Sequence, residues 1–191
     1  MKFALVTGCA GFIASHLVER LLLDNWNVLG LDNFHPYYDK ELKLKNLANF
    51  KDHKNFKFVE GSILDLDLLK TFSNVDAVFH LAAIAGVRNS FNNPQEYFDI
   101  NVKGTENILK TFQNIDELVF ASSSSVYGEL KQNEFPVKET HSLNPISPYG
   151  ESKKQSELLC EHYSKSSKIR TSILRFYTVY GPRQRPDEAI M

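Results

Sequence analysis

Short apolar runs alternate with helical stretches along nearly the whole chain. Three of the runs, at residues 4–6, 77–79 and 118–120, are apolar at every position and lack the alternating polarity of a strand that faces water on one side. Such runs are typical of strands that are buried on both faces, as in a parallel sheet covered by helices on both sides. The alternation therefore predicts βαβ units and an α/β fold with a doubly wound parallel sheet.

The same pattern predicts where the elements lie. Strands are expected at residues 3–7, 28–32, 56–60, 77–81, 118–122 and 171–176. Helices are expected at residues 12–23, 41–49, 64–72 and 149–164, and the long amphipathic stretch 94–112 is expected to be helical too. A loop that contains Pro136, Pro145 and Pro148 separates the fifth strand from the last helix.

The composition narrows the class of protein and its partners. A length of 191 residues suffices for one domain with a sizeable core. The net charge of -1 gives no electrostatic reason to expect nucleic acid or an anionic membrane as partner, and no apolar run is long enough for a membrane span. The two cysteines, Cys9 and Cys160, favour a reduced, cytoplasmic setting, and no His/Cys cluster predicts a metal site.

A glycine-rich turn joins the first predicted strand to the first predicted helix. The segment Thr7–Ala14 has the pattern G-x-x-G-x-x-A. Gly8 permits the tight turn, Gly11 lets the backbone approach a pyrophosphate, and the helix N-terminus supplies unpaired N–H groups to that anion. Alone the pattern is weak, because many strand-to-helix turns contain glycine.

Asp32 strengthens the interpretation of this turn as a dinucleotide site. It ends the second predicted strand, 21 residues after Gly11, where an acid that binds the ribose 2′-hydroxyl is expected. A carboxylate there repels a 2′-phosphate, so the sequence favours NAD over NADP. The alternatives are an ordinary acid at a strand end, and a preference altered by Arg20 or Lys43.

Tyr149 and Lys153 form a candidate catalytic pair. They are four residues apart and so lie on one face of the last predicted helix. The lysine ammonium lowers the pKa of the phenol, which lets tyrosinate act as a base near neutrality. Tyr127 and Lys131 have the same spacing, but they follow a predicted strand, in an expected loop. We therefore expect Tyr149, which follows Pro148 and opens a helix, to be the functional tyrosine.

A run of four serines, Ser122–Ser125, follows the fifth predicted strand. It lies at the carboxyl end of the strand, the edge at which open α/β sheets bind ligands. A hydroxyl there can bind the oxygen whose carbon loses hydride. Without the tyrosine and lysine, the run indicates only a polar loop.

Seven segments of the chain resemble one known family. They are TGCAGFIASHLVERLL, LDNF, HLAAIAGVRNS, NVKGTENIL, FASSSSVYGE, SPYGESK and RFYTVYGPRQRPD, and they cover nearly the whole length. The family is that of the extended short-chain dehydrogenases/reductases, specifically its NAD-dependent nucleotide-sugar epimerases and dehydratases. The resemblance implies a Rossmann-type domain and a catalytic set of Ser123, Tyr149 and Lys153.

The resemblance and the turn together imply a set of residues that bind NAD. These are Gly8, Gly11, Phe12, Ile13, Asp32, Asn33, Lys43, Ser62, Ile63, Leu81, Ala82, Ala83, Ala85, Asn101, Ser122, Tyr149, Lys153 and Tyr177.

The serine run also bears on the reaction. The resemblance implies that related dehydratases have an acid pair where this chain has Ser124 and Ser125, and that related decarboxylases have Glu at the position of Ser125. Because elimination needs such acids, reversible oxidation at one carbinol remains, which suits a 4-epimerase of UDP-sugars. Tyr37–Asp39, Ala85–Arg88 and the segment from Tyr177 to Asp187 resemble UDP-glucuronate 4-epimerases; UDP-glucose/galactose 4-epimerases are the alternative. Expected substrate-binding residues are Arg88, Ser124, Ser125, Thr178 and Arg185, while Arg183 and Arg185 are alternatively a solvated loop.

The resemblance places a boundary near the end of the chain. It implies an NAD-binding domain at 1–176 and the start of a substrate-binding region at 177–191, with most of that region expected to be missing. A fragment of an epimerase is the first interpretation; a natural truncation and a non-catalytic NAD-binding module are the others. The family commonly dimerises through helices equivalent to 94–112 and 149–164. Ile108, Phe112, Leu158 and Leu159 are candidate contacts, but they are equally good core residues.

Overall fold

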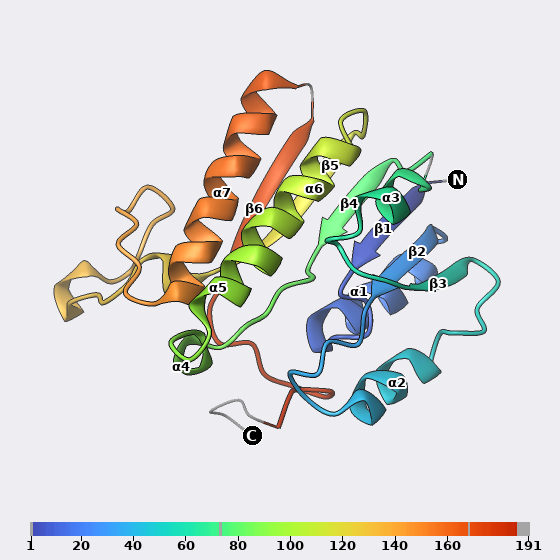
Figure 1. The fold of residues 1–191 in the computed structure, drawn as a ribbon, viewed down its shortest axis with the longest axis horizontal. Coiled ribbons are helices and arrows are strands. Elements are labelled where there is room, and N and C mark those ends of the chain that lie inside the picture. The colour runs from blue at the N-terminus through green and yellow to red at the C-terminus, as the bar shows by residue number, and fades with distance from the viewer. Residues whose placement is uncertain (1, 73, 168, 187–191) are drawn as a thin grey trace.

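Six parallel strands form one sheet in the computed structural model of the chain, which describes residues 2–72, 74–167 and 169–186. Their order across the sheet is β3-β2-β1-β4-β5-β6, the order of a Rossmann fold (Figure 1). The strands are β1 (Phe3–Thr7), β2 (Asn27–Asp32), β3 (Phe56–Glu60), β4 (Ala77–His80), β5 (Glu117–Ser123) and β6 (Arg170–Phe176). The predicted doubly wound sheet is confirmed.

Helices cover the two faces of the sheet, and each face has its own core. The helices α1 (Phe12–Leu23) and α2 (Lys40–Ala48) pack on one face. The helices α3 (Leu66–Lys70), α6 (Gly104–Thr111) and α7 (Pro148–Ser166) pack on the other. In β1, Leu5 faces the second group while Ala4 and Val6 face the first. Because both faces of the strand are buried, its sequence is apolar throughout.

The stretch 94–112 is helical but not one regular helix. It consists of α5 (Pro94–Tyr97), the π-helical segment η1 (Phe98–Lys103) and α6. In η1 the side chain of Asn101 accepts from the N–H of Ile84 at 2.9 Å and donates to its carbonyl at 3.0 Å. The short helix α4 (Val87–Ser90) and the 3-10 turns η2 (Ser124–Val126) and η3 (Gln132–Glu134) were not predicted, because three or four residues show no periodicity.

The start of α7 is fixed by local chemistry. Ser147 is its N-cap and accepts from the N–H of Gly150 at 3.0 Å, and Pro148 occupies the first turn. Tyr149 therefore lies in the first turn of the helix, at the carboxyl edge of the sheet.

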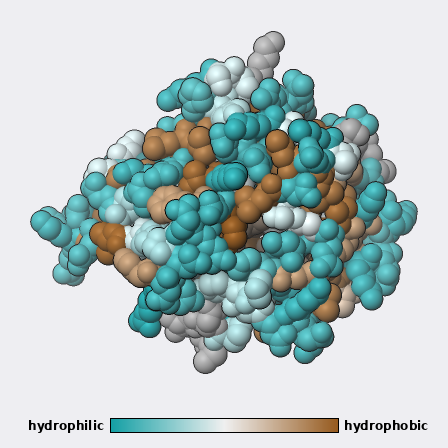
Figure 2. Space-filling view, viewed as in Figure 1, coloured by the Kyte–Doolittle hydropathy of each residue, from teal (hydrophilic) through white to brown (hydrophobic). Residues whose placement is uncertain are grey.

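The exposure of side chains and the lengths of the helices bear on two expectations, the candidate dimer contacts and the lack of a membrane span. Figure 2 shows apolar side chains gathered over the middle of the viewed face and hydrophilic ones around its edge. Of the candidate dimer contacts, Ile108 and Phe112 belong to the core, Leu159 packs against it and Leu158 is exposed. Among the described helices, none has the length and apolarity needed to cross a membrane.

Candidate functional site

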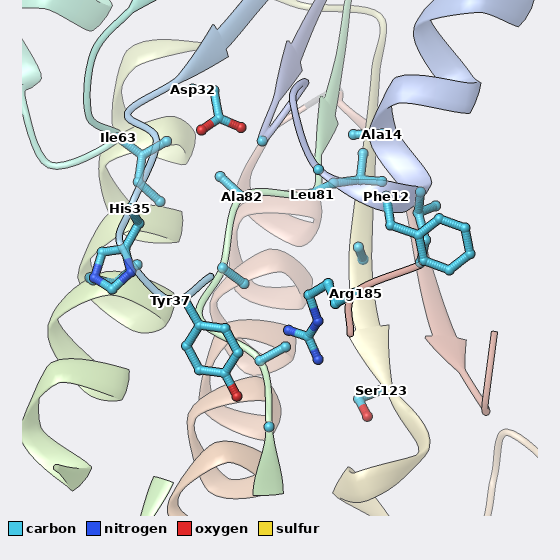
Figure 3. Close-up of a pocket in the computed structure, with 18 of the residues that line it drawn as sticks. Phe12, Ala14, Asp32, His35, Tyr37, Ile63, Leu81, Ala82, Ser123 and Arg185 are labelled. Atoms are coloured by element: carbon cyan, nitrogen blue, oxygen red, sulfur yellow. The ribbon is translucent and has the colours of Figure 1, made fainter. Parts of the chain in front are cut away.

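A cavity of about 500 Å³ opens at the carboxyl ends of the strands, where the chain order reverses between β1 and β4. This is the edge at which open α/β sheets bind ligands. Figure 3 shows Asp32 at the top of the view with Ala82 below it, Phe12 at the right-hand side and Ser123 toward the bottom. The cavity is therefore bounded by the glycine turn, the acid and the serine strand that the sequence singled out.

The glycine turn has the geometry that an anion site requires. Gly8 has φ +71°, and its N–H donates to the carbonyl of Leu31 at 2.7 Å. The N–H of Gly11 donates to the carbonyl of Gly8 at 2.8 Å. Helix α1 begins at Phe12 after the N-cap residue Gly11, which has no side chain to cap it, and Phe12 and Ile13 line the cavity. The first turn of α1 thus offers its N–H groups and the positive end of its dipole to a ligand.

The Asp32 carboxylate is fixed at the end of β2. It accepts from the N–H of Ala10 at 3.1 Å and from the N–H of Phe34 at 2.8 Å. Burial raises the pKa of Asp32, while the Phe34 N–H and the charge of Lys43 act in the opposite direction. Two backbone donors hold the carboxylate in place at the cavity wall, where it is available to accept from a further hydroxyl.

Lys43 lines the same end of the cavity. Its ammonium donates to the carbonyl of His35 at 2.7 Å and lies 4.6 Å from the centre of the Tyr38 ring. Burial lowers the pKa of Lys43, and Asp32 opposes that shift. The Lys43 ammonium, a cation near Asp32, is therefore already hydrogen-bonded to a backbone carbonyl of the protein.

The three candidate catalytic residues converge on the cavity. Ser123, Tyr149 and Lys153 all line it. The Lys153 ammonium donates to the carbonyl of Ala121 at 2.8 Å and lies 5.0 Å from the centre of the Phe120 ring. Burial lowers the pKa of Lys153 to about 8, so the ammonium is mostly protonated at neutral pH. This arrangement supplies a buried cation on the helix that carries the phenol.

The neighbours of Ser123 and Tyr149 complete the site. The Ser123 hydroxyl donates to the Ser125 hydroxyl and accepts from the Ser125 N–H, both at 3.1 Å. The Tyr149 ring meets the Tyr97 ring edge-on, with 6.2 Å between the ring centres. Ser123 therefore ends β5 at the cavity wall, with its hydroxyl held by Ser125.

Tyr127 occupies a different place, as expected. It is 5% exposed and lies outside the cavity lining. Its hydroxyl accepts from Nη1 of Arg175 at 3.0 Å and donates to the carbonyl of Lys138 at 3.4 Å. The second Tyr-x-x-x-Lys spacing does not form a helical pair, because Tyr127 caps η2 and Lys131 lies in the exposed loop that follows.

Most of the residues predicted to bind ligands line the cavity, but four do not. Asn101 is 2% exposed and lies behind the wall, where it holds the backbone of Ile84. Arg88, Ser124 and Ser125 are outside the lining as well. Their predicted ligand contacts stay predictions.

Other lining residues were not predicted as ligand contacts, although several of them lie in the glycine turn or in segments that carry the resemblance. His35, Tyr37 and Tyr38 follow β2, and Gly86 and Val87 precede α4. The remainder are Ala14, Leu31, Gly61, Leu64, Ile100, Ala121, Phe176 and Val179.

The segment after β6 returns along α1. Arg183 forms an ion pair with Glu19 at 2.7 Å and donates to the Ser15 hydroxyl at 3.2 Å. Arg185 lines the cavity and stacks 5.0 Å from the centre of the Tyr37 ring. Neither arginine is part of a freely solvated loop, so that alternative is wrong. Residues 187–191, which contain the last part of the predicted substrate region, lie outside the described residues.

Comparison with known proteins assigns the chain to a family. Residues 4–191 match the profile of the NAD dependent epimerase/dehydratase family. The chain belongs to this family. A Bacillus subtilis protein named an uncharacterised UDP-glucose epimerase is 49% identical over 189 residues, which are 97% of this chain and 59% of the relative. A UDP-glucuronate 4-epimerase of Thermodesulfobacterium geofontis is 41% identical over 100% of this chain and 60% of the relative.

Solved structures of family members have the same fold. The UDP-glucuronic acid 4-epimerase of Bacillus cereus, in complex with UDP-glucuronic acid and NAD, superposes with a TM-score of 0.92 at 41% identity and covers 98% of this chain and 60% of that one. The UDP-glucose 4-epimerase of Thermotoga maritima, with UDP-glucose, gives 0.86 at 34% identity, over 97% and 59%. This chain spans about 60% of the length of the relatives that it matches.

NAD is the cofactor of this epimerase/dehydratase family, and the residues of this chain fit it. The position of a Cβ on Gly8 is 2.9 Å from Cα and N of Ala82, so only glycine leaves the turn and the β4 loop this close together. The uncapped start of α1 suits the pyrophosphate and Asp32 suits a ribose hydroxyl. Lys153, Tyr149 and Ser123 lie in the same cavity for the reacting end.

We expect the substitution Gly8→Ala to damage both the turn and NAD binding. A non-glycine residue in the left-handed region costs about 1–2 kcal/mol, and the added Cβ lies 2.9 Å from backbone atoms of Ala82, so the backbone must shift to accept it. Urea denaturation measures the loss of stability, and titration with NAD measures the loss of affinity. A variant that retains both at the level of the unmodified protein contradicts this account of the turn.

Proposed function

We propose that the protein is a nucleotide-sugar 4-epimerase that acts on UDP-glucuronate by reversible oxidation at C4. One observation carries the proposal: Ser123, Tyr149 and Lys153 line the NAD cavity, and the positions that follow Ser123 are hydroxyls, Ser124 and Ser125, with no carboxylate. The set supports proton removal from a carbinol, and it lacks the acids that elimination of water requires at this position.

The chain's own residues divide the work of the reaction. Tyr149, as the phenolate, takes the proton of the sugar 4-hydroxyl and returns it in the second half of the cycle. The Ser123 hydroxyl holds the 4-oxygen in line with the phenol. NAD, when bound, supplies the hydride acceptor and donor for C4. Inversion requires the 4-keto sugar to turn in the cavity between the two half-reactions, so that the hydrogen returns on the opposite face.

Lys153 sets the charge of the site. Its ammonium is anchored to Ala121 and belongs to the same helical face as Tyr149. A nearby cation stabilises the phenolate relative to the phenol. The pKa of the phenol therefore falls toward neutrality, where the phenolate can act as a base. The same ammonium is suited to the hydroxyls of the nicotinamide ribose.

The choice of UDP-glucuronate rests on the residues available to a C6 carboxylate. Thr178 and Arg185 line the cavity, and Ser125 bonds to Ser123 at its edge. Arginine and hydroxyl donors suit a carboxylate. Arg88 and Ser124 are further proposed contacts. UDP-glucose is the second candidate, favoured by the name of the relative that is 49% identical.

A substrate comparison tests the proposal. We expect the full-length gene product to epimerise UDP-glucuronate with a kcat/KM at least about tenfold above that for UDP-glucose, since one charge-assisted contact is worth about 1.5–3 kcal/mol. Arg185→Leu should remove most of that preference, while Tyr180→Phe, at an exposed tyrosine outside the cavity lining, should not. Turnover of UDP-glucose alone makes the sugar assignment wrong. NAD binding without turnover of either sugar favours a non-catalytic NAD-binding module.

We also propose that the protein forms a homodimer through α6 and α7. Leu158 on α7 is 54% exposed and is the apolar side chain that this helix would offer to such a contact. Sedimentation of the full-length gene product and of a Leu158→Glu variant tests the proposal, and a monomer in both cases contradicts it.

A further inference from the structure

A buried chain of hydrogen bonds starts beside the glycine turn. The N–H of Ala82 donates to the Thr7 hydroxyl at 3.1 Å, and that hydroxyl lies 2.7 Å from Nδ1 of His80. On the other side of the ring, Nε2 of His80 lies 3.0 Å from the Thr105 hydroxyl, which donates to the carbonyl of Asn101 at 2.6 Å. The chain thus runs from β1 through β4 to the π-helical segment η1.

The chain continues from η1 to the catalytic helix. The side-chain amide of Asn101 donates to the Ser152 hydroxyl at 3.0 Å, and Ser152 donates to the carbonyl of Tyr149 at 2.8 Å. Ser156, also on α7, donates to the carbonyl of Asn101 at 2.9 Å. The side chains of this network are 2% exposed or less, so water does not compete for the bonds.

The direction of each bond fixes the protonation of His80. The Asn101 carbonyl only accepts, so Thr105 uses its single proton there and must accept from His80. His80 therefore carries a proton on Nε2. The Ala82 N–H only donates, which leaves the proton of Thr7 free to bond to Nδ1. All the partners are satisfied when the ring is neutral and protonated on Nε2.

The surroundings of His80 favour the neutral ring. It faces Thr7 on β1, Thr105 on α6, the Phe120 ring on β5 at 5.7 Å, and the charge of Lys153 on α7. Burial and then the Lys153 ammonium lower the pKa of His80 to about 3. A second cation here would oppose the charge on Lys153 that the phenol depends on.

We propose that His80 is a positioning residue that, as the neutral Nε2-protonated ring, holds the NAD-binding turn and the helix of Tyr149 and Lys153 in one fixed relation. Thr7, His80 and Thr105 do not line the cavity. Gly8, which follows Thr7, and Ala82, which is two residues after His80, do line it. Their effect on NAD is therefore exerted through the walls of the site. The proposal depends on NAD binding alone and not on the identity of the sugar.

Nitrogen NMR of the imidazole rings tests the first part. In protein labelled with ¹⁵N at histidine, we expect the His80 ring, assigned with a His80→Gln variant, to show the pattern of a proton on Nε2. The pattern should stay constant from about pH 5 to about pH 8, where an ordinary histidine titrates. A proton on Nδ1, or titration within that range, overturns the proposal.

A pair of threonine substitutions on α6 tests the second part. Thr105→Val removes the acceptor for His80 and leaves a buried donor unpaired. Thr111→Val is the matched control, because the Thr111 hydroxyl is buried and has no hydrogen-bond partner among the described residues. Thr105→Ser keeps the hydroxyl and is the rescue variant.

The expected result is a selective loss of NAD affinity. Calorimetric titration with NAD should show about a tenfold weaker Kd for Thr105→Val, as expected when a smaller fraction of the protein has the binding geometry. Thr111→Val and Thr105→Ser should stay within about twofold of the unmodified protein. Equal weakening in both valine variants, or no weakening in Thr105→Val, overturns the proposal. Because no sugar is present, neither result depends on the proposed epimerase activity.

Discussion

Replacement of Tyr149 by phenylalanine removes the proposed turnover and leaves NAD binding intact. The substitution deletes only the phenolic oxygen, and proton transfer by a positioned side chain contributes about 10²–10⁴-fold to a rate. The ring still packs edge-on against Tyr97, so the cavity keeps its shape. We therefore expect kcat for UDP-sugar epimerisation to fall by about that factor. A coupled assay measures kcat, and calorimetry measures the Kd for NAD.

Tyr127 provides the matched control for this substitution. Tyr127 and Tyr149 both begin a Tyr-Gly-Glu-x-Lys sequence. Tyr127, however, is buried away from the cavity and bonds to Arg175. Tyr127→Phe loses those bonds and some stability, but kcat should stay within about threefold, because no proton of the reaction passes through it. The assignment fails when Tyr149→Phe keeps more than a tenth of the turnover, or when both variants lose it alike.

The central strands and the cofactor turn could be predicted because their signals are local. Leu5 and its neighbours are apolar at every position since helices cover both faces, and that pattern is visible in three residues. Gly8 is required by its φ of +71° and by contact with Ala82. Tyr149 was distinguished from Tyr127 by Pro148 and the helical pattern that follows it, and the structure adds the Ser147 cap at the start of α7. In each case the residue type follows from the conformation of its own segment.

The features of the fold and the site that could not be predicted depend on partners that are distant in sequence. The π-helical segment η1 has the periodicity of an ordinary helix, and the bonds of Asn101 to Ile84, 17 residues earlier, give no sign in the sequence. His80 lies within an apolar strand, and its roles follow only from Thr7 and Thr105. Arg183 lies in a stretch of polar residues typical of a loop, and its ion pair with Glu19 spans 164 residues. Such contacts are products of the tertiary fold.

A buried ion pair between the catalytic helix and the last strand leads to the largest effect on stability. Glu157 on α7 is 1% exposed and accepts three hydrogen bonds from Arg175 on β6, at 2.8 to 3.1 Å. It also accepts from the Ser122 hydroxyl at the end of β5. Hydrogen bonding to the Glu157 carboxylate raises the pKa of Arg175 above its ordinary value. The carboxylate thus ties α7 to two strands beside the cavity.

We expect Arg175→Met to lower the free energy of unfolding by about 3–5 kcal/mol, since it removes the hydrogen-bonded partner of the buried Glu157 carboxylate. For a domain of this size that is a fall in Tm of about 6–20 °C. Thermal and urea denaturation measure both quantities. Arg20→Met is the control: Arg20 pairs with Asp24 on the surface of α1, and its loss should leave Tm unchanged within error.

A double substitution separates the cost of a stranded charge from the value of the pair. In Glu157→Gln combined with Arg175→Met both members of the ion pair are neutral, and the glutamine amide oxygen still accepts from Ser122. Replacement of a whole buried pair is often close to neutral, whereas removal of one partner is not. The double variant should therefore recover more than half of the stability that Arg175→Met loses. A double variant as unstable as the single one shows instead that the Arg175 contacts with Tyr127 and the Glu139 carbonyl, at 3.0 and 2.8 Å, carry the stabilisation.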